Sequence, residues 1–173
     1  MRLTTAGTNL STTFRHRIPF EIPQLKIRGK LMGLASVVRF DTTAHSVSVP
    51  LAMLSLIKKP GRIGLARYEV PHAIFQAVMA YSEDASLDQY DGFVICLDDM
   101  DMYLSRVKVS SAYLRSLYRR QAVTEDLPFY RSKKFNILDP DGRRGLLKLL
   151  MGLYRYLEES PQSRIKQNHI GYS

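Results

Sequence analysis

Residues 93–109 read FVICLDDMDMYLSRVKV, and this stretch decides the class of fold. Two apolar runs, Phe93 to Leu97 and Met102 to Val109, have the composition of β-strands, and the acidic residues Asp98 to Asp101 separate them. Strand-like runs joined by a few turn-forming residues predict a β-hairpin. The single cysteine, Cys96, lies inside the first run, so we expect a buried, small hydrophobic residue with no disulfide partner.

Further strands are predicted on the N-terminal side of this hairpin. Apolar residues alternate with polar ones from Ile18 to Phe40 and again from Val47 to Leu51, which is typical of a β-meander. Pro19 confines the first of these strands to the edge of a sheet, because proline cannot donate a ladder hydrogen bond. Between these strands and the hairpin, Pro71 fits the first position of a helix of about 11 residues.

Two helices are predicted on the C-terminal side. Ser110 or Ser111 can cap a helix that runs through Ala122. Asp139 and Pro140 supply an N-cap and a first-turn proline for a longer helix, which ends at Glu159 before Ser160-Pro161. Strands followed by helices indicate an α+β fold, with an antiparallel sheet packed against two to three helices.

The chain of 173 residues has the length of one compact domain. The polar stretch 1–13 is predicted to be a flexible arm, residues 14–160 the single α+β domain, and residues 161–173 a flexible tail. We find neither a signal peptide nor an apolar run of the roughly 18 residues that a membrane span needs.

The charges are segregated along the chain. Residues 1–67 carry 11 basic and 2 acidic residues, residues 68–101 carry 0 and 8, and residues 102–173 carry 14 and 6, so the net charges are +9, −8 and +8. The basic segments could bind a polyanion such as RNA or an anionic membrane, or the acidic segment of one copy could bind a basic face of another. The third alternative is that the segments neutralise each other inside the fold.

Several cations are candidates for contact with a polyanion. Arg115 and Arg119 are four residues apart on a predicted helix, an unfavourable spacing that a polyanion would relieve, and neighbouring tyrosines could stack on bases or belong to the core. Arg143 and Arg144 lie at the predicted start of the last helix, where a phosphate could bind backbone N–H groups. The candidate nucleic-acid or anion contacts are Arg115, Arg119, Arg120, Arg131, Lys133, Lys134, Arg143 and Arg144, and those for a membrane or other polyanion are Lys58, Lys59 and Arg62.

The last helix has an apolar face about 200° wide, since apolar residues occur throughout Leu146 to Leu157. A helix packed on a sheet is the first interpretation, and a helix lying on a membrane surface is the alternative. Its ends oppose the helix dipole, because Arg143 and Arg144 lie in the first turns and Glu158 and Glu159 in the last. Something external to the helix is expected to compensate these charges.

The sequence contains no recognisable catalytic motif, so we predict that the protein is not an enzyme and needs no cofactor or metal. Asp98, Asp99 and Asp101 form the one acidic cluster that could bind a divalent cation, but the ligand spacing of an EF-hand is missing. The four histidines, His16, His45, His72 and His169, show no metal-binding spacing.

The stretch Arg17-Ile18-Pro19-Phe20-Glu21-Ile22 and the alternating run to Phe40 resemble the entry to a β-strand in rhabdovirus matrix proteins. In size, basicity, polar arm and α+β layout the whole chain resembles the matrix proteins of negative-strand RNA viruses, and the short ones of plant rhabdoviruses (cytorhabdoviruses) most. The chain lacks the Pro-Pro-x-Tyr and Pro-Thr/Ser-Ala-Pro sequences of animal-virus members. No individual residue of the family carries over.

The resemblance implies a structural virion protein that self-associates and bridges ribonucleoprotein and anionic membrane during particle assembly. Its partners would be RNA or nucleocapsid, a membrane surface, further copies of itself, and a viral glycoprotein or nucleoprotein. It would be found in the virion and in the host cytoplasm, peripheral at membranes. The alternatives are a monomeric RNA-binding regulator, such as a silencing suppressor, and a small metal-dependent enzyme that uses Asp98, Asp99 and Asp101.

Overall fold

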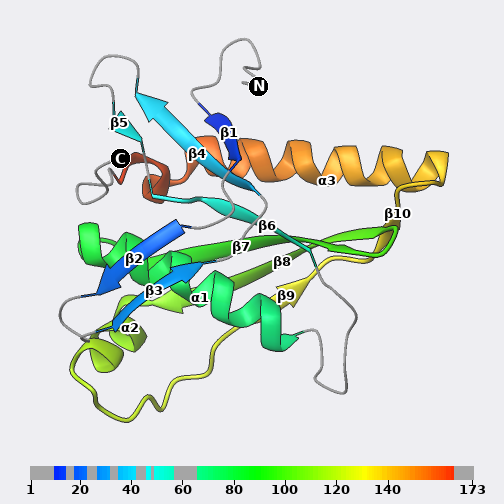
Figure 1. Cartoon of the computed structure of the whole chain (residues 1–173). Helices are drawn as coiled ribbons and strands as arrows, with labels where there is room; N and C mark the ends of the chain where they lie inside the picture. Colours follow the sequence, from blue (N-terminus) through cyan, green and yellow to red (C-terminus); the bar gives the residue numbers. More distant parts are fainter. Residues whose placement is uncertain are drawn as a thin grey trace.

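A mixed β-sheet with helices on both faces forms the centre of the molecule (Figure 1). The computed structural model describes residues 10–14, 18–22, 27–31, 35–41, 46–47, 49–56 and 66–165. The strand order of the sheet is β1-β4-β6-β7-β8-β10, with β5 beside β4 and β9 beside β8. The strands are β1 (Leu10–Phe14), β4 (Ala35–Asp41), β5 (Ser46–Val47), β6 (Ala52–Leu56), β7 (Gln89–Asp98), β8 (Asp101–Ser110), β9 (Phe129–Arg131) and β10 (Phe135–Asn136). This arrangement confirms the predicted α+β class.

The predicted hairpin is the longest pairing in this sheet. β7 and β8 run antiparallel from the pair Gln89–Ser110 to the pair Asp98–Asp101, and Asp99 and Met100 form the turn. Asp99 has a φ of 57°, a left-handed conformation that aspartate adopts more readily than most residues. Both strands extend beyond the predicted apolar runs: β7 already begins at Gln89, and β8 is longer by one residue at each end.

The sequence predicted an antiparallel sheet, but one pair of strands in the observed sheet is parallel. β6 and β7 are parallel, and α1 (Ala66–Glu83) lies between them in the chain. A helix between two strands carries the chain back to the end of the sheet where the first strand began, so the second strand runs in the same direction. The predicted meander is also wrong at β4, which pairs with β1 and β6, while β2 (Ile18–Ile22) and β3 (Ile27–Leu31) form a separate two-stranded sheet.

Two hydrophobic layers lie on opposite faces of the sheet. In β8 the side chains alternate: Tyr103 and Val107 belong to the core beneath α1, and Leu104 packs into the core beneath α3 (Pro140–Glu159). The buried Leu114 of α2 (Ser111–Tyr118) belongs to the α1 side. The helices α1 and α2 therefore cover one face, and α3 covers the other.

The helices α2 and α3 begin where the sequence predicted, and α3 also ends at the predicted Glu159, but the end of α2 and the start of α1 differ from the predictions. The Ser110 hydroxyl accepts a hydrogen bond from the Tyr113 N–H and caps α2, but this helix ends at Tyr118 and not at Ala122. Arg120 has a φ of 55°, which terminates the helix. The helix α1 begins at Ala66 and not at Pro71. The turn before Pro71 contains Glu69, whose carboxylate is bound inside the core and holds this turn in place.

Residues of both predicted flexible ends belong to secondary-structure elements. Residues 10–13 of the predicted arm belong to β1, where Leu10 is buried, and residues 1–9 lie outside the described part. Residues 161–164 of the predicted tail form a short 3-10 helix, η2 (Pro161–Arg164), and residues 166–173 are outside the described part. The buried Gln162 amide accepts from the Asp91 N–H at 2.7 Å and donates to the Asp91 carbonyl at 2.8 Å, which anchors η2 to the sheet.

Candidate binding surfaces

The acidic segment is partly neutralised inside the fold. Of the eight carboxylates in residues 68–101, at least three form ion pairs with cations of residues 102–173. The pairs are Glu69–Arg131 at 3.0 Å, Asp91–Arg106 at 2.9 Å and Asp98–Lys134 at 2.6 Å. These residues neutralise each other inside the fold, which is the third of the alternatives given above, so their charges do not contribute to an intermolecular surface.

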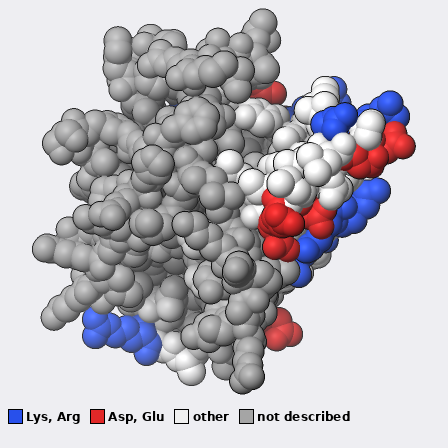
Figure 2. All heavy atoms as spheres, turned by 45° about the vertical axis from the view of Figure 1, so that its right-hand side comes forward, with Lys and Arg blue, Asp and Glu red and all other residues white. Residues whose placement is uncertain are grey.

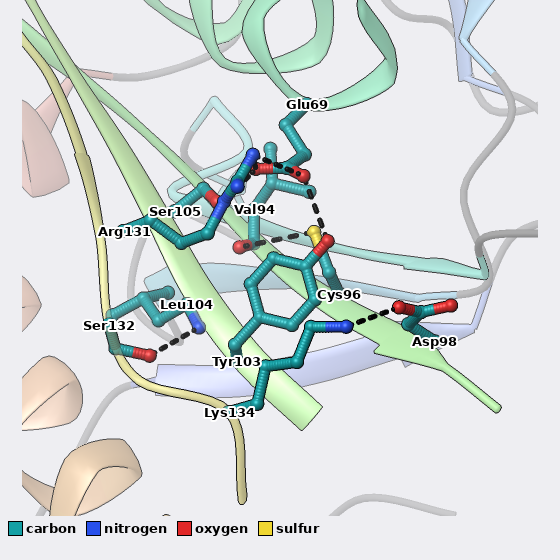
Figure 3. Close-up of polar contacts among 10 residues, drawn as sticks. All are labelled: Glu69, Val94, Cys96, Asp98, Tyr103, Leu104, Ser105, Arg131, Ser132 and Lys134. Atoms are coloured by element: carbon teal, nitrogen blue, oxygen red, sulfur yellow. Dashed lines mark hydrogen bonds and ion pairs between the residues drawn. The ribbon is translucent and has the colours of Figure 1, made fainter. Parts of the chain in front are cut away.

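Arg131 belongs to a buried polar cluster between α1 and the sheet (Figure 3). Glu69 is 1% exposed and accepts hydrogen bonds from the Tyr103 hydroxyl at 2.8 Å and from the Ser105 hydroxyl. The Arg131 guanidinium donates Nε to Oε2 at 3.1 Å and Nη2 to Oε1 at 3.0 Å. Burial raises the pKa of Tyr103, and so does the bond that it donates to Glu69. Arg131 is thus the counterion of a buried carboxylate, and its Nε and Nη2 are bound to Glu69.

Cys96 lies in the same layer and is buried, as predicted. Burial and the nearby Glu69 raise the pKa of its thiol to about 12. Since only the thiolate reacts with disulfide reagents, we expect no labelling of the native protein at pH 8. Labelling should follow the rate of unfolding in a urea series. Rapid stoichiometric labelling in buffer alone would contradict the buried position.

Lys133 and Lys134 lie near the end of the sheet, and each has a partner within the fold. Lys134 pairs with Asp98, and the Lys133 ammonium lies 5.1 Å from the centroid of the Phe135 ring. Asp101 accepts a hydrogen bond from the Asn136 amide at 3.2 Å. The three aspartates of the predicted metal cluster do not converge, and no three His, Cys, Asp or Glu residues in the described ranges form a metal-binding group.

The start of α3 is already capped by carboxylates. The Gly142 N–H donates to Asp139 at 2.7 Å, and Arg144 pairs with Asp141 at 2.9 Å. Arg143 donates to the carbonyls of Ile137 and Leu138, at 3.1 and 2.9 Å. Figure 2 shows blue and red side chains interleaved at this end of the molecule. A phosphate would meet two carboxylates here, so the geometry argues against the predicted anion site at Arg143 and Arg144.

The α2 basic surface, which comprises Arg115, Arg119 and Arg120, is exposed. Neither Arg115 nor Arg119 forms an ion pair with any residue of the described part. Tyr118 points inward, because its hydroxyl donates to the Val78 carbonyl at 3.3 Å and its ring packs 5.2 Å from the ring of Tyr81. Arg115 and Arg119 therefore offer guanidinium groups for phosphate contact, without a Tyr118 ring on which a base could stack.

The sequence analysis missed an exposed apolar strip on α3. Leu146, Leu153 and Leu157 are buried against the sheet, but Leu147 is 61% exposed and Met151 is 59% exposed. The signal was present in the sequence, since an apolar face 200° wide is about twice what packing on one sheet requires. The α3 outer face is the surface formed by Arg144, Leu147, Lys148, Met151, Arg155 and Glu158.

The orientation of α3 is fixed by a second buried carboxylate. Asp91 accepts from Arg106 Nη2 at 2.9 Å and from the Tyr156 hydroxyl, and Arg106 Nη2 also donates to the Tyr156 hydroxyl at 2.6 Å. Burial, followed by the Asp91 bond, raises the pKa of Tyr156 to about 12. Because this cluster holds one side of α3 on the sheet, the α3 outer face is turned away from the protein.

Lys58, Lys59 and Arg62, the predicted membrane contacts, lie outside the described residues. In the portion of the chain that the structure covers, no helix has the length and apolarity to cross a membrane. Comparisons with protein-family models, with curated proteins and with solved structures found nothing that matches the chain.

Proposed function

We propose that this protein is a structural assembly protein of the viral-matrix kind, which self-associates and bridges a ribonucleoprotein and an anionic membrane. One observation carries the proposal: the α2 basic surface and the α3 outer face lie on opposite faces of one sheet. A protein that binds two partners at once needs two surfaces that do not overlap. The α2 basic surface would bind the phosphates of RNA, and the α3 outer face would bind a further protein copy.

The chemistry of the α2 basic surface favours contact without sequence preference. Guanidinium groups bind phosphate through charge-assisted hydrogen bonds, and phosphate contacts carry no sequence information. A protein that coats a ribonucleoprotein along its whole length needs this kind of binding. The membrane contact that we assign to Lys58, Lys59 and Arg62 is part of the same proposal and rests on their charge.

The first test measures single-stranded RNA binding as a function of salt for Arg115→Gln/Arg119→Gln. Each phosphate contact contributes about 0.7 to the slope of log affinity against log salt for single strands, so the double variant should lower the slope by about 1.4. Lys108→Gln/Arg164→Gln removes the same charge outside both proposed surfaces and is the matched control. An equal decrease of this slope in both double variants would mean that net charge, and not the α2 basic surface, governs RNA binding.

The second test is flotation with anionic and neutral vesicles at low and high salt, with sedimentation of the protein alone across concentrations. Flotation with anionic vesicles that salt abolishes, together with self-association, is the expected result. A stable monomer that ignores both vesicle types but binds RNA stoichiometrically would favour the RNA-binding regulator instead.

A further inference from the structure

We infer that α3 is an isologous self-association element: it pairs antiparallel with α3 of a second copy, and the two-fold axis passes beside Met151. The inference rests on the proposed function and deepens it, because it names the surface through which copies bind. Three features of the described residues carry it, namely an exposed apolar centre, a symmetric placement of opposite charges, and charges that oppose the helix dipole.

The apolar centre of the α3 outer face has no partner within the described part of the protein. Leu147 and Met151 are one helical turn apart and are both more than half exposed. The opposite side of the helix is occupied, since Leu153 and Leu157 pack on the sheet and Tyr156 binds Asp91. Large apolar side chains that recur at helical spacing on an exposed face mark a protein contact.

The charges on this face are placed symmetrically about Met151. Arg144 lies seven residues before Met151, and Glu158 lies seven residues after it. Seven residues make nearly two turns, so the three side chains share one face, and each charge is about 10.5 Å along the axis from Met151. If two copies pair antiparallel with Met151 opposite Met151, Arg144 of each copy is level with Glu158 of the other. One residue further out, Arg143 is level with Glu159.

The same pairing relieves an unfavourable feature of the isolated helix. Cations in the first turns and anions in the last turn oppose the helix dipole, and neither Glu158 nor Glu159 forms an ion pair within the described part. In an antiparallel pair, Arg143 and Arg144 of one helix lie beside the acidic end of the other. Arg144 binds the exposed Asp141 of its own helix through Nη1 alone, so its Nη2 and Nε can bind Glu158 of the second copy. The charges that destabilise each helix alone thereby become complementary, which selects the antiparallel over the parallel arrangement.

This contact is expected to be weak on its own. A single pair of helices buries less than the roughly 1,200 Å² that a stable interface needs, so the dimer should form and dissociate with concentration. A two-fold contact closes on itself. It would therefore supply the dimeric unit of an assembly, and further growth would need another surface.

Charge exchange tests the pairing of Arg144 with Glu158. Arg144→Glu and Glu158→Arg should each weaken the dimer about tenfold in sedimentation equilibrium at low salt, because each places like charges opposite one another at both ends of the contact. The double variant Arg144→Glu/Glu158→Arg restores both pairs and should return the dissociation constant to within about threefold of the parent. Thermal melts of all three variants verify that they fold.

Cross-linking tests the position of the axis. Facing helices lie about 8–10 Å apart, and each Cα lies about 2.3 Å from its own axis, so two cysteines introduced by Met151→Cys meet disulfide geometry. Leu147→Cys is the matched control: its two copies lie eight residues apart along the axes, about 12 Å, too far for a bond. The buried Cys96 does not compete. Oxidation should give a covalent dimer of the first variant only.

The outcomes separate this inference from the proposed function. Self-association that none of the charge variants alters, or cross-linking at position 147 but not at 151, overturns the helix pair and leaves the RNA and vesicle tests standing. A parent protein that is monomeric at every concentration, with no cross-link at position 151, also overturns it. Rescue by the double variant in a protein that binds neither RNA nor vesicles supports the pair and refutes the bridging function.

Discussion

Replacement of Gly92 by alanine is expected to lower the free energy of unfolding by at least about 3 kcal/mol, the upper part of the range for overpacking. A Cβ at this position would lie 1.9 Å from the carbonyl oxygen of Ala73 and 2.4 Å from its carbonyl carbon. These are backbone atoms of α1, so no side-chain rotation can relieve the clash. The helix would have to move away from β7.

Such a movement would break further contacts. The Gln76 amide donates to the Phe93 carbonyl at 2.9 Å and accepts from the Phe93 N–H at 3.1 Å, and Ala73 and Ala77 are fully buried beside them. Urea unfolding measures the loss, and Gly152→Ala is the control, because nothing lies within 4 Å of a Cβ at that mid-helical position. That control should gain about 0.5–1 kcal/mol. A Gly92→Ala protein as stable as the parent would refute the close approach of α1 to β7.

The substitution Arg131→Ala is expected to destabilise the protein by about 3 kcal/mol, since it leaves the buried Glu69 carboxylate without its counterion. Glu69 would keep only the hydroxyl donors Tyr103 and Ser105. Lys133→Ala, two residues away and exposed, should change stability by no more than about 0.5 kcal/mol. Urea unfolding of both variants makes the comparison.

A double variant separates the effect of the uncompensated Glu69 charge from the effect of lost side-chain packing. Glu69→Gln/Arg131→Met removes both charges, so it should be more stable than Arg131→Ala alone. The RNA affinity of folded Arg131→Ala should match that of the parent, because its guanidinium is already bound to Glu69. A large loss of RNA affinity without loss of stability would show that Arg131 is a contact residue after all.

The candidate surfaces were only partly predictable, for a definite reason. Sequence shows that a residue is basic, but it does not show which carboxylate reaches it. Glu69 and Arg131 are 62 residues apart and meet only because α1 and β9 both pack near β8. The same holds for Asp98 and Lys134. Of the predicted cations, Arg115 and Arg119 on α2 remain as the best-placed phosphate contacts.

The sequence by itself determined the features that depend on residues close together in the chain. The hairpin follows from two apolar runs around a four-residue acidic stretch, and α3 begins at Asp139-Pro140 and ends at Glu159 because cap, proline and stop residues act within one turn. The burial of Cys96 follows from the apolar run around it.

Only the tertiary structure decided how these pieces combine. The parallel pairing of β6 with β7 depends on α1 crossing the sheet. The pairing of β10 and the burial of Leu10 and Gln162 depend on partners far along the chain. The two sides of α3 look alike in sequence, because large apolar residues occur on both. Which side is buried is decided by where the sheet and Asp91 lie, and the exposed Leu147 and Met151 are left as a surface for another molecule.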